Sequence, residues 1–289
     1  MGLKDIKKVL IIGAGTMGQQ IGLQVALSGF DVVIYDLSEK ILDNAQKRIM
    51  ELGRQLIEVK KIKEDDLYKA LERISTSTDP EKASFDVDFV SESVPEDPAL
   101  KAKVFSEFNN YCKEGTIFTT NTSSLVPSMF AKETGRPDKF AALHFHDIRI
   151  TNIVDVMPHP DTSKETIDTI VDFAHVIGQE PIVLKKENPG YVFNAMLMEW
   201  LKAALTLAAN EIATIEDIDR AWQGVMNYPT GPFRIMDNIG LDTVYKVTKY
   251  WADKTNHKQS KKNAMFLKQY VDKGKLGVKT GEGFYLYKK

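Results

Sequence analysis

The sequence predicts an α/β protein of two domains: a doubly wound, mostly parallel sheet with an inserted helical hairpin, followed by an all-α domain. In the first half, short apolar and β-branched runs alternate with helical patterns, which is typical of βαβ units. A glycine-rich turn joins the first run to the first helix. From about residue 190 to the tail the patterning is helical only. A length of 289 residues also favours two domains, since single cores stop growing near about 250–300 residues.

Composition excludes several classes of protein. The chain is 43% hydrophobic and 27% charged, which is ordinary for a globular protein. With 38 basic and 40 acidic residues it has no basic field to hold a nucleic acid, so we expect no such partner. The single cysteine, Cys112, excludes an internal disulfide and favours a reducing compartment, so we expect the cytoplasm. No apolar stretch approaches about 18 residues, so we expect no membrane span.

Seven short runs predict the strands of the sheet. They are Lys8–Ile12, Asp31–Tyr35, Phe89–Ser91, Ile117–Thr120, Phe140–His146, Asn152–Met157 and Pro181–Leu184. Between the second and third runs, helical spacing predicts a hairpin of two helices over residues 38–56 and 65–73. A basic cluster, Lys60, Lys61 and Lys63, lies near its turn. It is either a solvated connection or a site for the phosphates of a ligand.

The domain boundary is predicted where Glu, Asn, Pro and Gly at residues 187–190 interrupt the pattern. The first domain then covers residues 1–186 and the second covers residues 187–289. Helices of the second domain are expected in four places. These are Val192–Ala209, a helix capped near Thr214, Asp242–Ala252 and Asn263–Lys273.

Residues 13–18 read Gly-Ala-Gly-Thr-Met-Gly and lie between the first strand and a helix, and Asp36 ends the second strand. This is the order that a Rossmann-type dinucleotide site requires. Gly13 permits the tight turn, Gly15 lets the backbone approach a pyrophosphate, and Gly18 lets the helix pack on the sheet. Asp36 would bind ribose hydroxyls and repel a 2′-phosphate, so NAD is predicted over NADP. The alternative is a glycine turn without a cofactor.

Hydride transfer from an alcohol needs a base, and His144 is the predicted one. Asp155 on the next strand could orient its imidazole and stabilise the protonated form. A histidine in a strand is otherwise often structural. His146 shares the face of His144, so a metal site of both histidines and Asp155 is a second alternative. It has no clear fourth ligand, and we expect no metal.

Two further sets of polar residues are candidates for the site. Asn121-Thr122-Ser123-Ser124-Leu125 follows a strand at its carboxyl end, where ligands bind in open α/β sheets. Ser123 or Ser124 could instead cap a short helix. Asn194 lies inside an apolar stretch, so its amide must find partners, either between the domains or at the active site.

Six segments together resemble the short-chain L-3-hydroxyacyl-CoA dehydrogenases, including the bacterial 3-hydroxybutyryl-CoA dehydrogenases. They are the glycine motif at 13–18, Asn-Thr-Ser-Ser-Leu at 121–125, Leu-His-Phe at 143–145, Pro-Gly-Tyr-Val-Phe-Asn at 189–194, Tyr-Pro-Thr-Gly-Pro-Phe at 228–233 and Gly-Val-Lys-Thr-Gly-Glu-Gly-Phe-Tyr at 277–285. Their order covers nearly the whole chain. The resemblance implies an NAD-binding domain, a helical domain that dimerises, an active site between them and a hairpin that contacts CoA.

The resemblance also implies roles for particular residues. The implied substrate-site residues are Ser123, His144, Asp155 and Asn194. The predicted cofactor-binding residues are Gly13, Gly15, Thr16, Met17, Gly18, Asp36 and Asn121, with Glu96 and Lys101 lining the cleft. The chain departs from the family where His-Phe-Phe-Asn-Pro is usual, because it reads His-Phe-His-Asp-Ile at 144–148. It also supplies Asp155 in place of a glutamate, with one residue fewer between. Arg149 could meet an anionic substrate or pair with Asp147.

The resemblance implies NAD-dependent interconversion of a short-chain (S)-3-hydroxyacyl-CoA and its 3-ketoacyl-CoA. His144 would act as the base, Asp155 would orient it, and Ser123 and Asn194 would hydrogen-bond the reacting oxygen or the thioester carbonyl. One alternative is a dehydrogenase of a 3-hydroxy acid that is not a CoA ester, such as a sugar acid. Another is a cofactor-binding protein whose catalytic residues are idle. The expected partners are an acyl-CoA and a second copy of the chain.

Overall fold

The computed structural model describes residues 2–287 in two compact units, of which one ends at Val192 and the other begins at Phe193. We predicted this boundary between residues 186 and 187. Residues 1, 288 and 289 of the predicted domains lie outside the described residues. Among residues 2–287, no helix is both long enough and apolar enough to cross a membrane.

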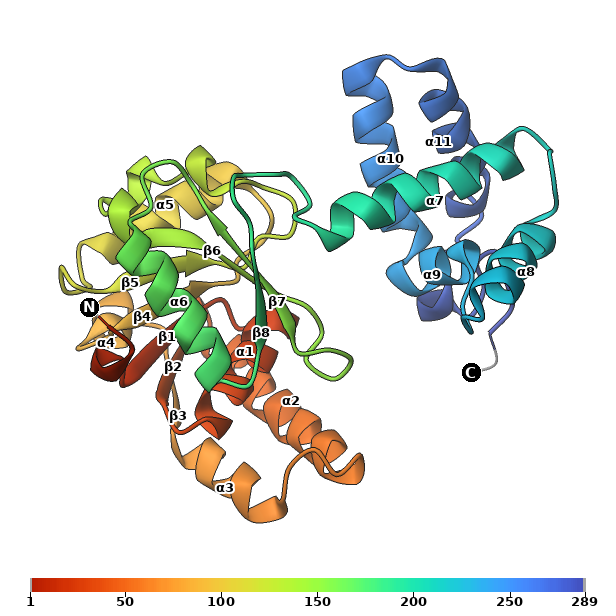
Figure 1. The fold of residues 1–289 in the computed structure, drawn as a ribbon. Coiled ribbons are helices and arrows are strands. Elements are labelled where there is room, and N and C mark those ends of the chain that lie inside the picture. The colour runs from red at the N-terminus through yellow and green to blue at the C-terminus, as the bar shows by residue number, and fades with distance from the viewer. Residues whose placement is uncertain (1, 288–289) are drawn as a thin grey trace. The chain divides into compact units, whose positions relative to one another are not determined.

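The first unit is built on one eight-stranded sheet with the order β3-β2-β1-β4-β5-β6-β7-β8 (Figure 1). The strands are β1 Lys8–Ile12, β2 Asp31–Tyr35, β3 Ile74–Ser77, β4 Phe89–Glu92, β5 Ile117–Thr120, β6 Phe140–Phe145, β7 Ile153–Pro158 and β8 Glu180–Val183. Only β6 and β7 pair antiparallel. The predicted doubly wound sheet is confirmed.

One strand was not predicted, and four predicted strands differ from the observed β4, β6, β7 and β8 by one residue at one or both ends. The strand that was not predicted is β3, which reads Ile-Ser-Thr-Ser and lies half-buried at one end of the sheet. A short polar edge strand carries no apolar run by which periodicity could reveal it. The predicted strand Phe140–His146 ends one residue earlier, at Phe145, because the chain turns there into the connection to β7.

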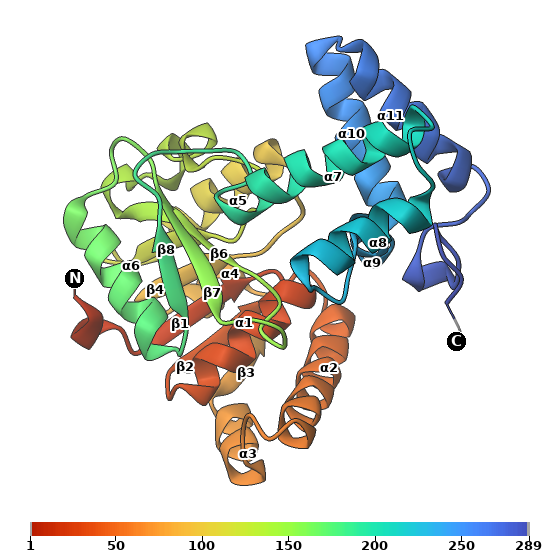
Figure 2. The same ribbon diagram turned by 45° about the vertical axis from the view of Figure 1, so that its right-hand side comes forward.

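Helices cover both faces of the sheet (Figure 2). In the first unit they are α1 Thr16–Leu27, α2 Glu39–Glu58, α3 Glu64–Glu72, α4 Pro80–Ser84, α5 Pro98–Asn109 and α6 Lys164–Val176, with short 3₁₀ turns at Leu3–Asp5, Pro127–Met129, Lys132–Thr134 and Pro137–Lys139. Side chains alternate along each strand, so Ile11 of β1 belongs to the core under α1, α2 and α6. Leu10 belongs to the opposite core, with Phe105 and Phe108 of α5.

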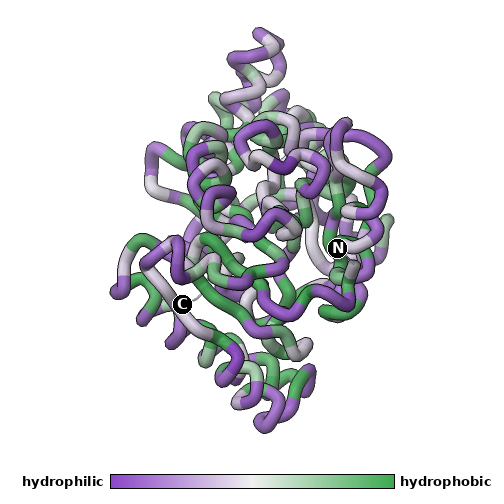
Figure 3. Tube along the Cα trace, turned by 90° about the vertical axis from the view of Figure 1, so that its left-hand side faces the viewer, coloured by the Kyte–Doolittle hydropathy of each residue, from purple (hydrophilic) through white to green (hydrophobic). Residues whose placement is uncertain are grey.

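The predicted helical hairpin is confirmed as α2 and α3. One face of α2 is buried, and hydrophobic and hydrophilic residues alternate along the hairpin, at the bottom of Figure 3. At Gly53 an added Cβ would lie only 2.2 Å from Cδ1 of Leu67 on α3. A side chain there would push the two helices apart, so glycine permits their close packing.

The second unit is helical, as predicted. Its helices are α7 Phe193–Ala209, α8 Ile215–Met226, α9 Pro232–Ile239, α10 Leu241–Thr255 and α11 Lys258–Val271, with a 3₁₀ turn at Val278–Thr280. The Thr214 hydroxyl caps α8 by accepting the Asp217 N–H at 3.1 Å. Helix α9, which has eight residues and begins at Pro232, was not predicted.

Candidate active site

The glycine turn between β1 and α1 has the shape of a phosphate cradle. Gly13 has a φ of +103°, and an added Cβ would lie 2.8 Å from the Ser93 carbonyl oxygen. At Gly18 an added Cβ would lie 1.9 Å from the Gly13 oxygen, so both positions are closed by the protein's own backbone. At Gly15 an added Cβ would meet nothing within 4 Å. The space over Gly15 is therefore open, beside the first N–H groups of α1 at Thr16 and Met17, which suits an anion.

Asp36 lies at the end of β2 with its carboxylate turned to this cradle. Its Oδ2 accepts the Ala14 N–H at 2.8 Å and its Oδ1 accepts the Leu37 N–H at 2.7 Å. A carboxylate oxygen accepts more than one hydrogen bond, so both oxygens retain capacity for ribose hydroxyls. The turn and Asp36 together fit the adenosine and pyrophosphate part of a dinucleotide.

The predicted base and its partner lie opposite each other on β6 and β7. Antiparallel register pairs His144 with Asp155, and His144 Nδ1 lies 3.1 Å from Asp155 Oδ2. Burial acts to raise the pKa of Asp155, but hydrogen bonds from His144 and His146 outweigh it, and the pKa lies below its ordinary value. The carboxylate is therefore ionised and can only accept. His144 must carry its proton on Nδ1, which leaves Nε2 as the acceptor that a general base requires.

Tyr191 covers the imidazole of His144, a contact that sequence reasoning missed. The two rings stack with centroids 4.7 Å apart and an interplanar angle of 20°. The Tyr191 hydroxyl donates to the Thr122 carbonyl at 2.6 Å, and burial raises the pKa of this phenol, so it stays protonated. Its only signal in the sequence was its place in the segment at 189–194 that carried the family resemblance. Tyr191 thus restrains the ring that Asp155 orients.

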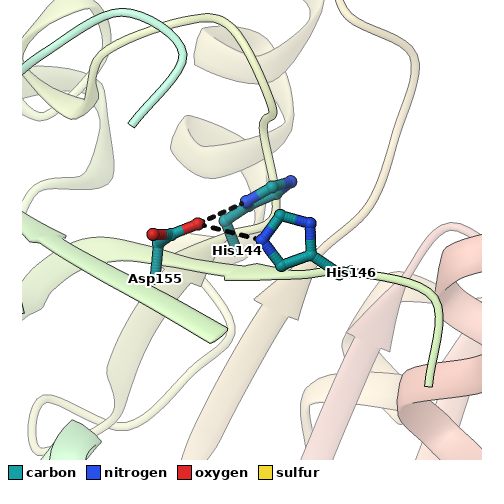
Figure 4. Close-up of side chains that lie close together, drawn as sticks. All are labelled: His144, His146 and Asp155. Carbon is teal, nitrogen blue, oxygen red and sulfur yellow. Dashed lines mark hydrogen bonds and ion pairs between the residues drawn. The ribbon is translucent and has the colours of Figure 1, made fainter. Parts of the chain in front are cut away.

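His146 approaches the same carboxylate, although it lies beyond the end of β6. Its Nε2 is 3.2 Å from Asp155 Oδ2, so one oxygen contacts both imidazoles (Figure 4). Ligand-type atoms of His144, His146 and Asp155 all lie within 4.8 Å of one another, which is the cluster that the metal alternative required. Two N–H donors on one carboxylate oxygen account for the observed distances. That the site works without a metal stays a prediction.

Glu96 organises the loop after β5. Its Oε1 accepts from the hydroxyls of Thr122 and Ser124 and from the N–H groups of Ser123 and Ser124. Burial acts to raise the pKa of Glu96, but hydrogen bonds from Thr122 and Ser124 and the Lys101 charge hold it below its ordinary value. Ser123 and Ser124 therefore do not cap a helix, since Val126 precedes the next 3₁₀ turn. The loop that carries Ser123 is held by an ionised carboxylate.

Asn121 and Lys101 support this loop from within. The Asn121 side-chain oxygen accepts the Phe145 N–H at 2.7 Å and so ties the loop to the end of β6, next to His144. Lys101 is 1% exposed, with Nζ 2.7 Å from Glu92 Oε1 and 3.4 Å from Glu96 Oε2. Its ammonium lies inside the first unit, so its effect on the site passes through Glu96.

The segment that departs from the family pattern is anchored at three points. Gln20 of α1 accepts the Ile148 N–H at 3.0 Å. Lys61, at the hairpin turn, donates to the Arg149 carbonyl at 2.9 Å and to the Ile148 carbonyl at 3.3 Å. Arg149 pairs with Asp147, with Nε 2.9 Å from Oδ1. Of the two roles suggested for Arg149, the structure shows the pairing with Asp147.

Asn194 belongs to the second unit, where it lies half-buried on the first turn of α7. Its role toward His144 stays a prediction.

In the first unit, β1, β4, β5 and β6 run parallel, so the cradle after β1 and His144 near the end of β6 lie at the same edge of the sheet. A dinucleotide cradle and an oriented histidine at one edge define a nucleotide-dependent dehydrogenase.

Comparison with known proteins identifies the family. Residues 8–188 match the NAD binding domain of 3-hydroxyacyl-CoA dehydrogenase, and residues 190–287 match its C-terminal domain. The mitochondrial hydroxyacyl-coenzyme A dehydrogenase of Sus scrofa is 36% identical over 294 residues, which cover 98% of this chain and 92% of that protein. This chain therefore belongs to the 3-hydroxyacyl-CoA dehydrogenase family and is an NAD-dependent oxidoreductase.

Two solved structures are similar over the full length. A diketoreductase, described as a substrate-directed dual catalyst of dicarbonyl compounds, superposes with a TM-score of 0.91 at 40% identity, covering 99% of this chain and 100% of its own. The (S)-3-hydroxybutyryl-CoA dehydrogenase of Ralstonia eutropha has a TM-score of 0.89 at 31% identity, covering 98% and 100%.

Replacing Asp36 with serine is expected to lower the preference for NAD over NADP by about tenfold or more, because the carboxylate opposes a 2′-phosphate. The measurement is kcat/KM for each cofactor, in the wild type and the variant. Equal or better turnover of the wild type with NADP would contradict this assignment of Asp36.

Proposed function

We propose that this protein interconverts a short-chain (S)-3-hydroxyacyl-CoA and the corresponding 3-ketoacyl-CoA. The observation that carries the proposal is the His144–Asp155 pair, in which an ionised carboxylate leaves Nε2 of His144 as an acceptor. This pair lies at the same edge of the sheet as the dinucleotide cradle. Family membership and the relatives named above support the substrate class.

In the oxidation direction, Nε2 of His144 takes the proton of the substrate's 3-hydroxyl group. NAD, held by the glycine turn and Asp36, would supply the acceptor for the hydride from C3. The imidazolium that forms is stabilised by Asp155, whose Oδ2 lies 3.1 Å from Nδ1. In reduction the imidazolium returns its proton to the 3-keto oxygen. Ser123 and Asn194, assigned by resemblance, would hydrogen-bond the reacting oxygen or the thioester carbonyl.

The direct test follows NADH absorbance with acetoacetyl-CoA, longer 3-ketoacyl-CoA esters and free acetoacetate. We expect oxidation of NADH with acetoacetyl-CoA and no comparable rate with the free acid. The panel also ranks chain lengths. Failure of every thioester to support turnover would overturn the proposal and leave two alternatives, a dehydrogenase of a substrate without CoA and an idle, cofactor-binding protein.

A second candidate is a dehydrogenase of a 3-hydroxy acid or a dicarbonyl compound without CoA. Likeness to the diketoreductase and the altered segment at residues 146–150 favour it. An anionic substrate would then draw Arg149 away from Asp147. This candidate predicts that the wild-type protein turns over the free acid and not acetoacetyl-CoA. It also predicts that Arg149→Ala abolishes turnover of the free acid. Our proposal predicts that the same variant retains its rate with acetoacetyl-CoA.

The hairpin lysines offer a test of CoA recognition. Lys61 holds the backbone of residues 148 and 149, so Lys60 and Lys63 remain as candidates for the CoA phosphates. Reversing both to glutamate is expected to raise the KM for acetoacetyl-CoA about threefold to tenfold at low salt, with the KM for NADH unchanged. The effect should shrink at high salt, because the charges are exposed and screened.

A matched control replaces Lys82 and Lys164 with glutamate. These lysines lie elsewhere on the first unit, and their side chains are 81% and 86% exposed. An equal rise in KM in this control would assign the effect to net charge and not to the hairpin.

We propose in addition a cytoplasmic homodimer assembled through the helical unit. The single cysteine and the family resemblance support this. Light scattering coupled to gel filtration is expected to show twice the 32.6 kDa mass of the chain.

A further inference from the structure

We propose that His146 is a positioning residue of this active site, which holds the Asp155 carboxylate in the orientation that His144 requires. The inference rests on the proposed function, because it concerns the same proton transfer.

All described support of the Asp155 carboxylate converges on one oxygen. Oδ2 contacts His144 Nδ1 at 3.1 Å and His146 Nε2 at 3.2 Å (Figure 4). Oδ1 is buried, and within residues 2–287 it has no hydrogen-bond partner. The hydrogen bonds that fix this carboxylate therefore come from the two imidazoles, and the described residues provide no third donor to it.

The charge of the carboxylate determines which nitrogens carry protons. An ionised aspartate only accepts hydrogen bonds, so the nitrogen that faces it on each ring must be an N–H. His144 is then the Nδ1–H tautomer and His146 the Nε2–H tautomer. Both bonds are charge-assisted, which makes them stronger than neutral ones.

Loss of the His146 bond would leave the carboxylate with the single bond to His144. It could then rotate about its Cβ–Cγ bond, and the N–H of His144 would lose a partner of fixed position. The base would sample orientations in which Nε2 does not point at the substrate. Turnover should fall while substrate and cofactor binding remain.

The local fold has anchors other than this imidazole. The segment around His146 is anchored by the Gln20–Ile148 bond, by Lys61 and by the Asp147–Arg149 pair. The His146 side chain is 18% exposed, against 6% for His144, so replacing it leaves no sealed cavity. A change at residue 146 therefore acts on the carboxylate and on the edge contact of this ring with His144, whose centroid lies 4.7 Å away. Phenylalanine keeps a ring for that contact.

The experiment compares His146→Phe with His146→Gln. Phenylalanine keeps a ring but removes the donor, whereas glutamine restores an amide N–H of similar reach. For His146→Phe we expect kcat with acetoacetyl-CoA and NADH to fall roughly tenfold to hundredfold, the range for a hydrogen bond to a charged group. Both KM values should stay within about twofold, and His146→Gln should recover most of the loss.

A second measurement is independent of turnover. Imidazole ¹⁵N NMR of the apo protein reports the tautomer of each of the five histidines, and His144→Gln assigns the signal of His144. We expect His144 as Nδ1–H in the wild type and a mixture of tautomers in His146→Phe. If the wild type fails to reduce acetoacetyl-CoA, the proposed function fails, yet the tautomers still decide this inference.

Two results would overturn the inference. One is a His146→Phe enzyme with wild-type kcat and an unchanged His144 tautomer. The other is an equal loss of kcat in the Phe and Gln variants with lowered thermal stability in both, which would make the role of His146 one of packing.

Discussion

Replacement of His144 with glutamine is expected to lower kcat for acetoacetyl-CoA reduction by about 10²–10⁴-fold, because an amide cannot exchange a proton with the substrate oxygen. Glutamine is similar in reach and polarity, so the buried site should stay filled. NADH affinity, measured by fluorescence titration, should be unchanged, since Gly15 and Asp36 lie on other elements. A variant with near wild-type kcat would require another base.

The partner residue provides the control for this result. Asp155→Asn should cost part of the same factor, because an amide can present an N–H to His144 and favour the wrong tautomer. Combining both changes should cost little more than His144→Gln alone, since the carboxylate acts only through the imidazole. Additive losses would show that Asp155 has a separate role.

Replacement of Lys101 with methionine is expected to lower the free energy of unfolding by about 3–5 kcal/mol at pH 7. The reason is that Glu92 is fully buried and would lose the ammonium 2.7 Å from its Oε1. Urea unfolding followed by circular dichroism measures the loss. Tryptophan fluorescence would miss it, because Trp200, Trp222 and Trp251 all lie in the second unit.

The pH dependence of this loss has a definite sign. Burial raises the pKa of Glu92 even though Lys101 and Thr120 act to lower it. The folded protein thus binds this proton more tightly than the unfolded chain, so stability falls as pH rises above the ordinary glutamate pKa. Without Lys101 the fall should be steeper, and the deficit of Lys101→Met should be smaller at pH 5 than at pH 7.

The matched control for this prediction replaces Glu92 with glutamine in the Lys101→Met background. It removes the buried charge together with its partner, so much of the lost stability should return. A Lys101→Met protein as stable as the wild type at pH 7 would contradict the assignment of Lys101 and Glu92 as a buried pair.

Local sequence patterns were enough to predict the fold class and the residues of the dinucleotide cradle. Strand and helix periodicities depend on near neighbours, and a glycine with a φ of +103° follows directly from the tight turn at Gly13. The pairing of His144 with Asp155 was also predicted, because the two residues lie on strands that follow each other in the sequence. The edge strand β3 was not predicted, since three of its four residues are polar.

Other features of the site depend on contacts between distant parts of the chain. Three such contacts form only in the tertiary fold. Tyr191 stacks on His144, and Lys101 is buried between Glu92 and Glu96. Lys61 donates a hydrogen bond to the Arg149 carbonyl. The periodicity of a sequence does not predict which side chains contact each other at the edge of a sheet. Two histidines could be assigned to one strand face from the sequence, but only the path of the chain after β6 brings His146 to the same oxygen of Asp155 as His144.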